Sequence, residues 1–289
     1  MVEYLIGVDG GGTGTRVRIE RADGSELGRG SAGPSGLMHG AGKAWAAIQE
    51  AINDAFVNAG VMPPAPATLA VGLGLAGVIN GQWAAEFIET NPGFGVIKVE
   101  TDAFCSLLGA HLGKPGAIIA VGTGIIGEAL LNDGTRREVS GWGFPAGDDG
   151  SGAWLGLHAI IHAQHALDGR RRPSAFTSAI VSASGGNRDG MFNWLYTANQ
   201  TAYAQLAPIV IALAAQDDVA HALMVRAGQE IAEIAAALDP AGQLPIAMAG
   251  GLAAPMNEYL PQQMRDRVVT PQADAISGAL QLIHGHFAK

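Results

Sequence analysis

The alternation of apolar and polar positions divides the first 111 residues into strands and helices. Residues 5–8 form a short apolar run, and residues 16–20 alternate polar and apolar side chains, which is typical of strands. Between 44 and 59 the apolar residues recur every three or four positions, the pattern of a helix with one buried face. The predicted order is three strands, a helix, and then strand, helix, strand and helix, with strands at 5–8, 16–20, 27–30, 68–75 and 96–101 and helices at 44–59, 84–89 and 103–111.

The pattern then starts again, which indicates an internal repeat. The apolar run 117–121 leads into Gly122-Thr123-Gly124 and a further apolar stretch to Leu131, as residues 5–8 lead into the glycines after Asp9. Duplicated halves imply a cleft between them, so we expect an α/β protein with domains at 1–112 and 113–289, the last helix being free to pack back on the first domain. Further expected elements are helices at 153–167, 200–213, 219–238 and 276–286 and a buried strand at 244–249.

Composition narrows the classes of function. The chain has 17 basic and 26 acidic side chains, a formal charge of −9, which argues against a broad surface for nucleic acid or anionic membrane. A single cysteine excludes a disulfide framework and a cysteine-rich metal site. No basic leader precedes the first strand and no apolar run is long enough for a membrane helix, so we expect a cytoplasmic protein acting on small molecules.

The segment from Asp9 to Thr15 reads Asp-Gly-Gly-Gly-Thr-Gly-Thr and predicts a phosphate-binding loop. Consecutive small residues expose backbone N–H groups, and Thr13 and Thr15 add hydroxyl donors. No Lys-Ser/Thr follows the glycines, and a strand comes next rather than a helix, so neither a P-loop nor a dinucleotide fold is expected. Asp9 could hold Mg²⁺ through water. The alternative is an ordinary glycine turn.

A second candidate is Asp102, in Thr101-Asp102-Ala103, where a strand ends and a helix begins. The helix dipole favours an ionised carboxylate there, which could accept a proton from a hydroxyl group. Position alone favours the alternative, a helix N-cap.

A third candidate is the glycine-rich loop from Gly141 to Ser151, which carries Trp142 and the acids Asp148 and Asp149. Carboxylates accept hydrogen bonds from vicinal hydroxyls while an aromatic ring covers an apolar sugar face, so the loop suits a sugar. The alternative is a helix capped by Ser151 with a buried tryptophan.

These segments, taken in order, resemble the N-acetylglucosamine kinase and BadF/BadG/BcrA/BcrD ATPase family of the actin/hexokinase-like superfamily. The resemblance implies two ribonuclease-H-like domains that close over ATP, Mg²⁺ and a sugar, and it leaves open whether the protein is a homodimer. Seven segments carry it, and the end of the chain from Asp274 to Ala279 also fits: 9–13, 74–77, 101–103, 122–124, 141–143, 147–151 and 249–251.

The resemblance also implies roles for particular residues. Asp102 is the general base on the sugar hydroxyl, and Asp9 positions the metal. The expected nucleotide-binding residues are Gly11, Gly12, Thr13, Thr15, Thr123, Gly124, Ala214, Gly250 and Gly251. The expected sugar-binding residues are Ser35, Gly36, Gly77, Ile125, Trp142, Gly143 and Asp148.

The sequence departs from the family at several of these positions. Gly14 stands where a lysine is frequent, Gly36 replaces an asparagine, and Ile125-Ile126 replace a Ser-Asn type pair, so the sugar stays open among N-acetylglucosamine, glucosamine, glucose and other hexoses. An activator ATPase of the same family is an alternative, but it needs cysteines for an iron–sulfur cluster. A non-catalytic sugar or nucleotide sensor is the other alternative.

Overall fold

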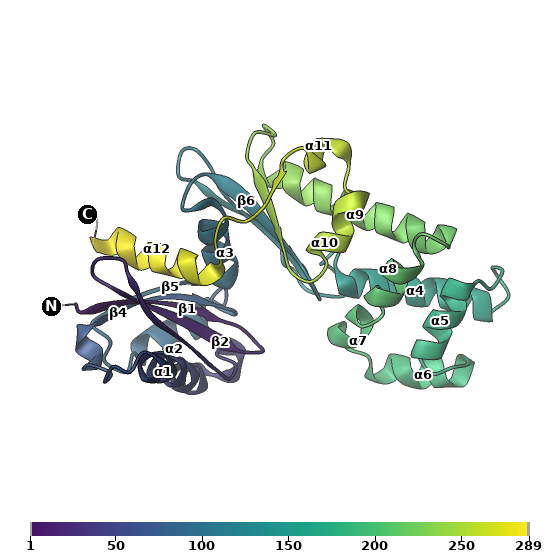
Figure 1. Ribbon diagram of the computed structural model, residues 1–289. Helices are drawn as coiled ribbons and strands as arrows, with labels where there is room; N and C mark the ends of the chain where they lie inside the picture. The colour runs from purple at the N-terminus through teal and green to yellow at the C-terminus, as the bar shows by residue number, and fades with distance from the viewer. Residues whose placement is uncertain (1, 288–289) are drawn as a thin grey trace. The chain divides into compact units, whose positions relative to one another are not determined.

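The computed structural model describes residues 2–287, which form two compact units (Figure 1). One unit comprises residues 2–116 and 270–287, and the other residues 117–269. The domain boundary expected after residue 112 lies close to residue 116, where the amino-terminal segment of the first unit ends. The sequence analysis counted the segment from residue 270 with the second domain and allowed its last helix to pack back on the first. In the structure this segment belongs to the first unit.

The first unit is built on a five-stranded sheet of order β3-β2-β1-β4-β5. Strands β1, β4 and β5 are parallel, while β2 pairs antiparallel with both β1 and β3. The expected order of strands and helices in this part is confirmed. The elements are β1 (Tyr4–Gly10), β2 (Thr15–Arg21), β3 (Glu26–Ala32), α1 (Ala41–Asn58), β4 (Leu69–Leu75), α2 (Gly81–Glu89), β5 (Val96–Thr101) and α3 (Asp102–His111), with 3₁₀ turns at Leu37–His39 and Pro66–Thr68.

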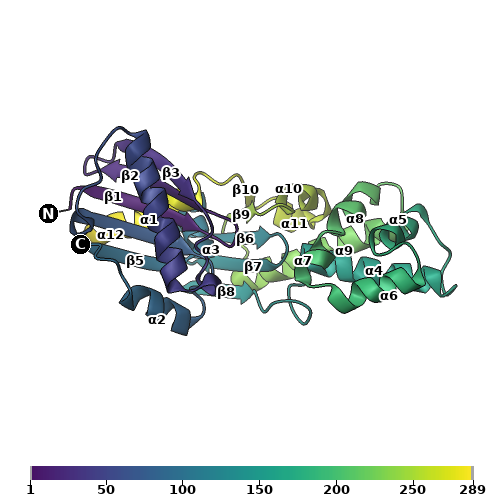
Figure 2. The same cartoon turned by 90° about the horizontal axis from the view of Figure 1, so that it is seen from below.

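Helix α1 covers one face of this sheet, running across the strands in Figure 2. Its buried face includes Trp45, Ile48 and Phe56, and the Trp45 ring stacks on Phe87 with centroids 4.0 Å apart. This spacing of buried residues is the one that predicted the helix.

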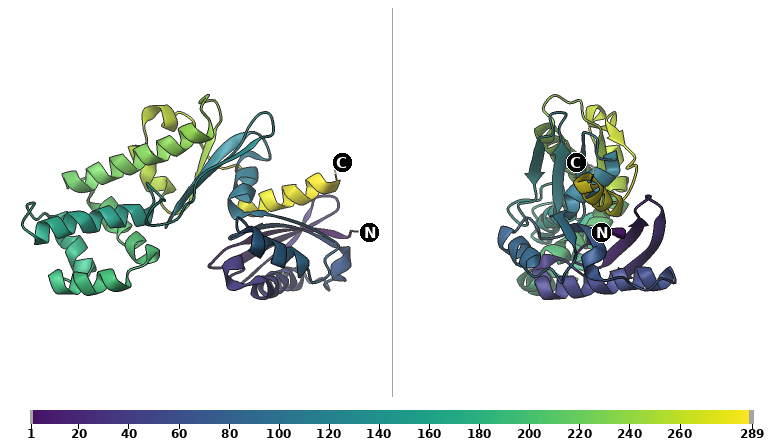
Figure 3. Two further views of the ribbon diagram at one scale, coloured as in Figure 1. Left: turned by 180° about the vertical axis from the view of Figure 1, so that it is seen from behind. Right: turned by 90° about the vertical axis from the view of Figure 1, so that its left-hand side faces the viewer.

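Helix α12 (Ala275–Phe287) covers the opposite face and packs against α3 and β1 (Figure 3). It lies so close that a Cβ atom on Gly72 of β4 would stand 1.9 Å from the carbonyl oxygen of Ala279. Ile276, Leu280 and Ile283 are buried on the sheet, and this buried apolar face explains why the segment joins the first unit.

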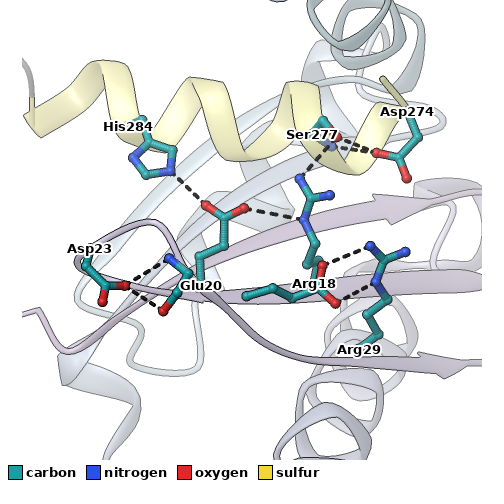
Figure 4. Close-up of polar contacts among 9 residues, drawn as sticks. Arg18, Glu20, Asp23, Arg29, Asp274, Ser277 and His284 are labelled. Atoms are coloured by element: carbon teal, nitrogen blue, oxygen red, sulfur yellow. Dashed lines mark hydrogen bonds and ion pairs between the residues drawn. The ribbon is translucent and has the colours of Figure 1, made fainter. Parts of the chain in front are cut away.

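Polar contacts also join α12 to β2 (Figure 4). The Arg18 guanidinium donates to Ser277 Oγ at 3.0 Å, and Arg18 Nε lies 3.5 Å from Glu20 Oε1. The other oxygen of Glu20 is 2.9 Å from His284 Nε2. These contacts fix the position of the helix along the sheet.

The second unit repeats the strand order of the first. Its sheet runs β10-β9-β6-β7-β8, so β6 takes the central place of β1 and β9 that of β4. The strands are β6 (Gly116–Val121), β7 (Ile125–Leu130), β8 (Arg136–Ser140), β9 (Ile246–Ala249) and β10 (Val268–Val269). The repeat expected from the sequence is present in the topology.

The helices of this unit extend beyond the sequence-based expectation. The helix predicted at 200–213 is two helices, and Pro208 lies in the first turn of the second, where the missing N–H costs least. Two helices between 175 and 197 were not predicted. The helices are α4 (Gly152–Leu167), α5 (Ala175–Ala183), α6 (Arg188–Thr197), α7 (Gln200–Ala204), α8 (Ala207–Leu213), α9 (Asp218–Leu238), α10 (Ala253–Met256) and α11 (Gln262–Arg265), with a 3₁₀ turn at Asn257–Tyr259.

Within residues 2–287, no single helix combines the length and the apolar character needed to cross a membrane. The segments Gln200–Leu213 and Asp218–Leu238 meet these two criteria only when taken together, as a pair bent by 114°.

Candidate active site

In the first unit the candidate residues gather where the parallel strands end. Asp9 lies near the end of β1, Gly77 follows β4, and Asp102 follows β5 directly. Backbone hydrogen bonds join the loops at this edge: Ala76 N–H donates to Gly10 at 2.9 Å, and Gly36 N–H to Gly11 at 3.0 Å. The carboxyl edge of a parallel sheet is the usual place for a ligand site.

The glycines after β1 have two different roles. A Cβ atom on Gly10 would stand 2.1 Å from Ser35 Oγ, so Gly10 allows the loop after β3 to pack closely. Cβ atoms on Gly11 and Gly12 would meet nothing within 4 Å, and Thr13 is exposed. Gly11, Gly12 and Thr13 therefore border open space, as a ligand-binding loop requires.

Thr15 and Ser35 stand inside this loop rather than on its open side. Thr15 Oγ1 lies 2.7 Å from Ser35 Oγ and 2.6 Å from the Gly33 carbonyl oxygen, and both side chains are buried. The sequence analysis assigned them to nucleotide and sugar. In the structure their hydroxyls bond to each other and join the two loops. The sequence contains a signal for this at Thr15, because side chains alternate along a strand and Thr15 lies on the same inward face of β2 as Val17.

Asp102 is the first residue of α3 and does not cap the helix. Thr101 is the N-cap, since its Oγ1 accepts from Phe104 N–H at 3.0 Å. Asp102 Oδ1 accepts from Ala103 N–H at 3.0 Å. Burial raises the pKa of the Asp102 carboxyl above its usual value, and the negative charge of Asp9 raises it further. Asp102 is therefore a stronger proton acceptor than an exposed aspartate.

Asp9 pairs with Arg16 across the β1–β2 ladder, with Asp9 Oδ2 2.5 Å from the guanidinium. The Arg16 side chain is 67% exposed and that of Asp9 is 16% exposed. Within residues 2–287, His, Cys, Asp and Glu side chains form no group of three or more that could hold a metal ion.

In the second unit the turn Gly122-Thr123-Gly124 is held by the start of α4. Gly152 N–H donates to the Gly122 carbonyl at 2.8 Å, and Ala153 N–H to the Thr123 carbonyl at 3.1 Å, while the Thr123 residue is exposed. This turn follows β6 as the Asp9 loop follows β1.

Gly250 and Gly251 follow β9 in the same unit. Gly250 has a φ of +88°, and a Cβ atom there would stand 2.3 Å from the carbonyl oxygen of Val121, so a side chain is excluded. A Cβ atom on Gly251 would meet nothing within 4 Å. The two glycines thus let this turn lie against the end of β6 and leave an open backbone edge beside it.

The loop from Gly141 to Ser151 presents one exposed ring and one buried acid. The Trp142 residue is 89% exposed, while Asp148 is 4% exposed and has a φ of +65°. Asp148 Oδ2 accepts from Gln200 Nε2 at 2.8 Å and Oδ1 from Gly143 N–H at 3.3 Å. A Cβ atom on Gly124 would stand 2.6 Å from Asp148 Oδ2, so the acid lies directly against the Gly122–Gly124 turn.

Sequence reasoning missed Gln200, which lies 52 positions from Asp148, and no local pattern marks it. Ile125 and Ala214, expected at the sugar and the nucleotide, are each 3% exposed, so their side chains belong to the core. Gly77 has a φ of +93°, and a Cβ there would lie 3.3 Å from Leu37.

Comparison with known proteins places this chain in a family. The profile of the BadF/BadG/BcrA/BcrD ATPase family matches residues 6–282. The glucosamine kinase GspK of Vibrio cholerae is 34% identical over 281 residues, which cover 96% of this chain and 95% of that protein. The solved structure named "Putative N-acetylglucosamine Kinase from Chromobacterium violaceum" is 46% identical, with a TM-score of 0.90, and the match covers 98% of this chain and 99% of that one.

A more distant structure supports the fold alone. A ROK family glucokinase from Streptomyces griseus, solved with glucose and AMPPNP, has 18% identity and a TM-score of 0.52, covering 97% of this chain and 98% of its own. The repeated strand order agrees with the actin/hexokinase-like fold that the family resemblance implied. By these matches the chain is a member of the BadF/BadG/BcrA/BcrD ATPase family.

Proposed function

We propose that the protein is an ATP-dependent sugar kinase that phosphorylates a hydroxyl group of an amino sugar. Its relatives along nearly the whole chain carry the names of glucosamine and N-acetylglucosamine kinases. The observation that carries the proposal is Asp102, a partly buried carboxylate with a raised pKa at the carboxyl edge of the first sheet.

Asp102 acts as the general base in this proposal. It takes the proton from the sugar hydroxyl as the oxygen bonds to the γ-phosphorus of ATP, and the bond from that phosphorus to the β–γ bridging oxygen breaks, which releases ADP. Raising the pKa of the carboxylate brings it nearer to the working pH, where a general base is most effective.

The nucleotide is assigned to the open glycine turns of each unit. Gly11, Gly12 and Gly251 leave room at the backbone where side chains would otherwise fill it. Thr13 and Thr123 are exposed beside them and can donate hydroxyl hydrogen bonds to phosphate oxygens.

Asp9 is assigned to the magnesium ion. Its carboxylate is the donor type that Mg²⁺ prefers, and its position near the end of β1 beside these glycines fits an ion held through water. Magnesium, when bound, would neutralise charge on the phosphate groups.

The amino sugar is assigned to Trp142, Gly143 and Asp148. Both carboxylate oxygens of Asp148 accept from neutral N–H groups, and no described residue forms an ion pair with it. A carboxylate can accept hydrogen bonds from the hydroxyl or ammonium groups of an amino sugar. The exposed Trp142 ring can cover the apolar face of the sugar.

The alternatives are weaker. An activator ATPase that shares a cluster between subunits needs accessible cysteine ligands, and the single cysteine, Cys105, is buried in α3. A non-catalytic sensor has no need for the base, yet Asp102 is present with a raised pKa.

The test measures ADP release with glucosamine, N-acetylglucosamine and glucose as acceptors. We expect Asp102→Asn to lower kcat by at least about 100-fold while ATP affinity is kept. Asp218→Asn is the matched control, because Asp218 is also the first residue of a helix but is exposed. A wild-type protein that phosphorylates none of the sugars, or an Asp102→Asn variant with normal kcat, refutes the proposal.

A further inference from the structure

We propose that Gln200 is a positioning residue, which fixes the carboxylate of Asp148 and thereby sets the affinity of the enzyme for its sugar. This inference rests on the proposed function, because it takes Asp148 as a sugar contact. Gln200 Nε2 donates to Asp148 Oδ2 at 2.8 Å, which is the shorter of the two hydrogen bonds to that carboxylate.

The carboxylate needs such a partner because of where it lies. Asp148 is 4% exposed, so water cannot replace a missing donor easily, and its backbone adopts the left-handed region that non-glycine residues avoid. Its other donor, Gly143 N–H, is 3.3 Å away and belongs to the same loop. Gln200 is the donor that comes from outside the loop and ties the acid to the helical part of the unit.

Gln200 itself stands on a well-fixed element. It begins α7, and the backbone of this helix touches α4 so closely that a Cβ atom on Gly156 would lie 1.9 Å from the Tyr203 carbonyl oxygen. The Tyr203 ring packs against Phe144 and Trp194, with centroids 5.0 Å apart in each pair. Asn199 caps the helix by accepting from Ala202 N–H at 3.0 Å.

The same contact reaches the Gly122–Gly124 turn, which the proposed function assigns to the nucleotide. A Cβ atom on Gly124 would lie 2.6 Å from Asp148 Oδ2 and 3.2 Å from Gln200 Nε2, so the amide and the carboxylate together occupy the space beside Gly124. Gln200 therefore fixes the orientation of the Asp148 carboxylate beside the Gly122–Gly124 turn. A group that orients a contact made equally before and during the reaction changes KM for that ligand and leaves kcat nearly unchanged.

The test compares Gln200→Met, which keeps the length and removes the donor, with Gln200→Glu, which places a second acid beside Asp148. We expect KM for the sugar to rise by about 10-fold or more in Gln200→Met, since hydrogen bonds to charged groups have effects of this order. The sugar KM should also rise in Gln200→Glu, because the second carboxylate cannot donate to Asp148 unless it takes up a proton. In both variants kcat and KM for ATP should stay within about 3-fold of wild type. Gln205→Met is the control, because Gln205 follows the same helix and is exposed.

Three outcomes overturn the inference. An unchanged sugar KM in both Gln200 variants shows that the amide does not position the acid. A fall in kcat that accompanies a similar rise in KM for both the sugar and ATP, together with a lower melting temperature, shows a purely structural role. A wild-type protein that neither binds nor phosphorylates sugar removes the proposed function as well, which distinguishes that failure from the first two.

Discussion

The close packing of α12 on α3 predicts that Gly278→Ala destabilises the protein. A Cβ atom on Gly278 would stand 1.8 Å from the carbonyl oxygen of Cys105 and 2.8 Å from Gly109 N. Both neighbours are backbone atoms of α3 and cannot rotate away. Because ordinary contact begins near 3.4 Å, the two helices must move apart by about 1.6 Å at this point.

The magnitude follows from two opposing effects. Overpacking of this kind costs about 1–3 kcal/mol or more, while alanine gains up to about 1 kcal/mol over glycine inside a helix. We expect a net loss of about 2 kcal/mol, or roughly 5 °C in melting temperature. Since Asp102 begins α3, the same displacement should also lower kcat.

The assay is urea unfolding followed by circular dichroism, with ADP release measured on the same samples. Gly285→Ala is the matched control, because Gly285 lies in the same helix and a Cβ there meets nothing within 4 Å. That variant should be neutral or more stable by up to about 1 kcal/mol. If Gly278→Ala proves as stable as Gly285→Ala, the helix contact is not as close as described.

Further predictions concern charge and exposed groups. The pKa of Asp102 is higher in the folded protein than the usual 3.8, so the protonated carboxyl stabilises the fold below pH 3.8 and this contribution is lost as the pH rises through the raised pKa. Near neutral pH the Asp102→Asn variant should therefore have a higher free energy of unfolding than wild type, measured in urea titrations. In acid this difference should disappear. In wild type, kcat/KM should fall as acidification protonates the same carboxyl. Trp142→Ala should raise the sugar KM without changing the melting temperature, because the ring is 89% exposed. Glu20→Gln should cost more than about 1 kcal/mol of unfolding free energy in the same urea titrations, because it removes the carboxylate 3.5 Å from Nε of Arg18, whose side chain is only 16% exposed.

Most of the fold could be predicted because its elements carry clear periodicity. The fully buried strand β4 and the amphipathic helix α1 both have strong apolar patterns, and the glycines after β1 and β6 marked the repeat. Helix α6 escaped prediction because Met191 is its buried residue while Phe192 and Tyr196 are exposed, which blurs the pattern.

The candidate site could be predicted in part. Asp102 was marked by its position between a strand and a helix, but its raised pKa depends on burial that only the packed structure supplies. Thr15 differs from Asp102, because its position in a glycine-rich segment suggested a phosphate contact. The alternation of buried and exposed residues along β2 already indicated that its side chain is buried. Gln200 could not have been found, because its meeting with Asp148 depends on how α7 docks on α4.

The return of α12 to the first unit has a consequence for biosynthesis. Residues 275–287 leave the ribosome after the whole of the second unit, yet they cover the β1–β4 face and brace α3. During synthesis the first unit therefore lacks the helix that covers Leu5 and Ala70. Residues 117–269 are made before that helix and can fold first. The second unit is an insertion in the first, and the amino-terminal part of this chain is completed last.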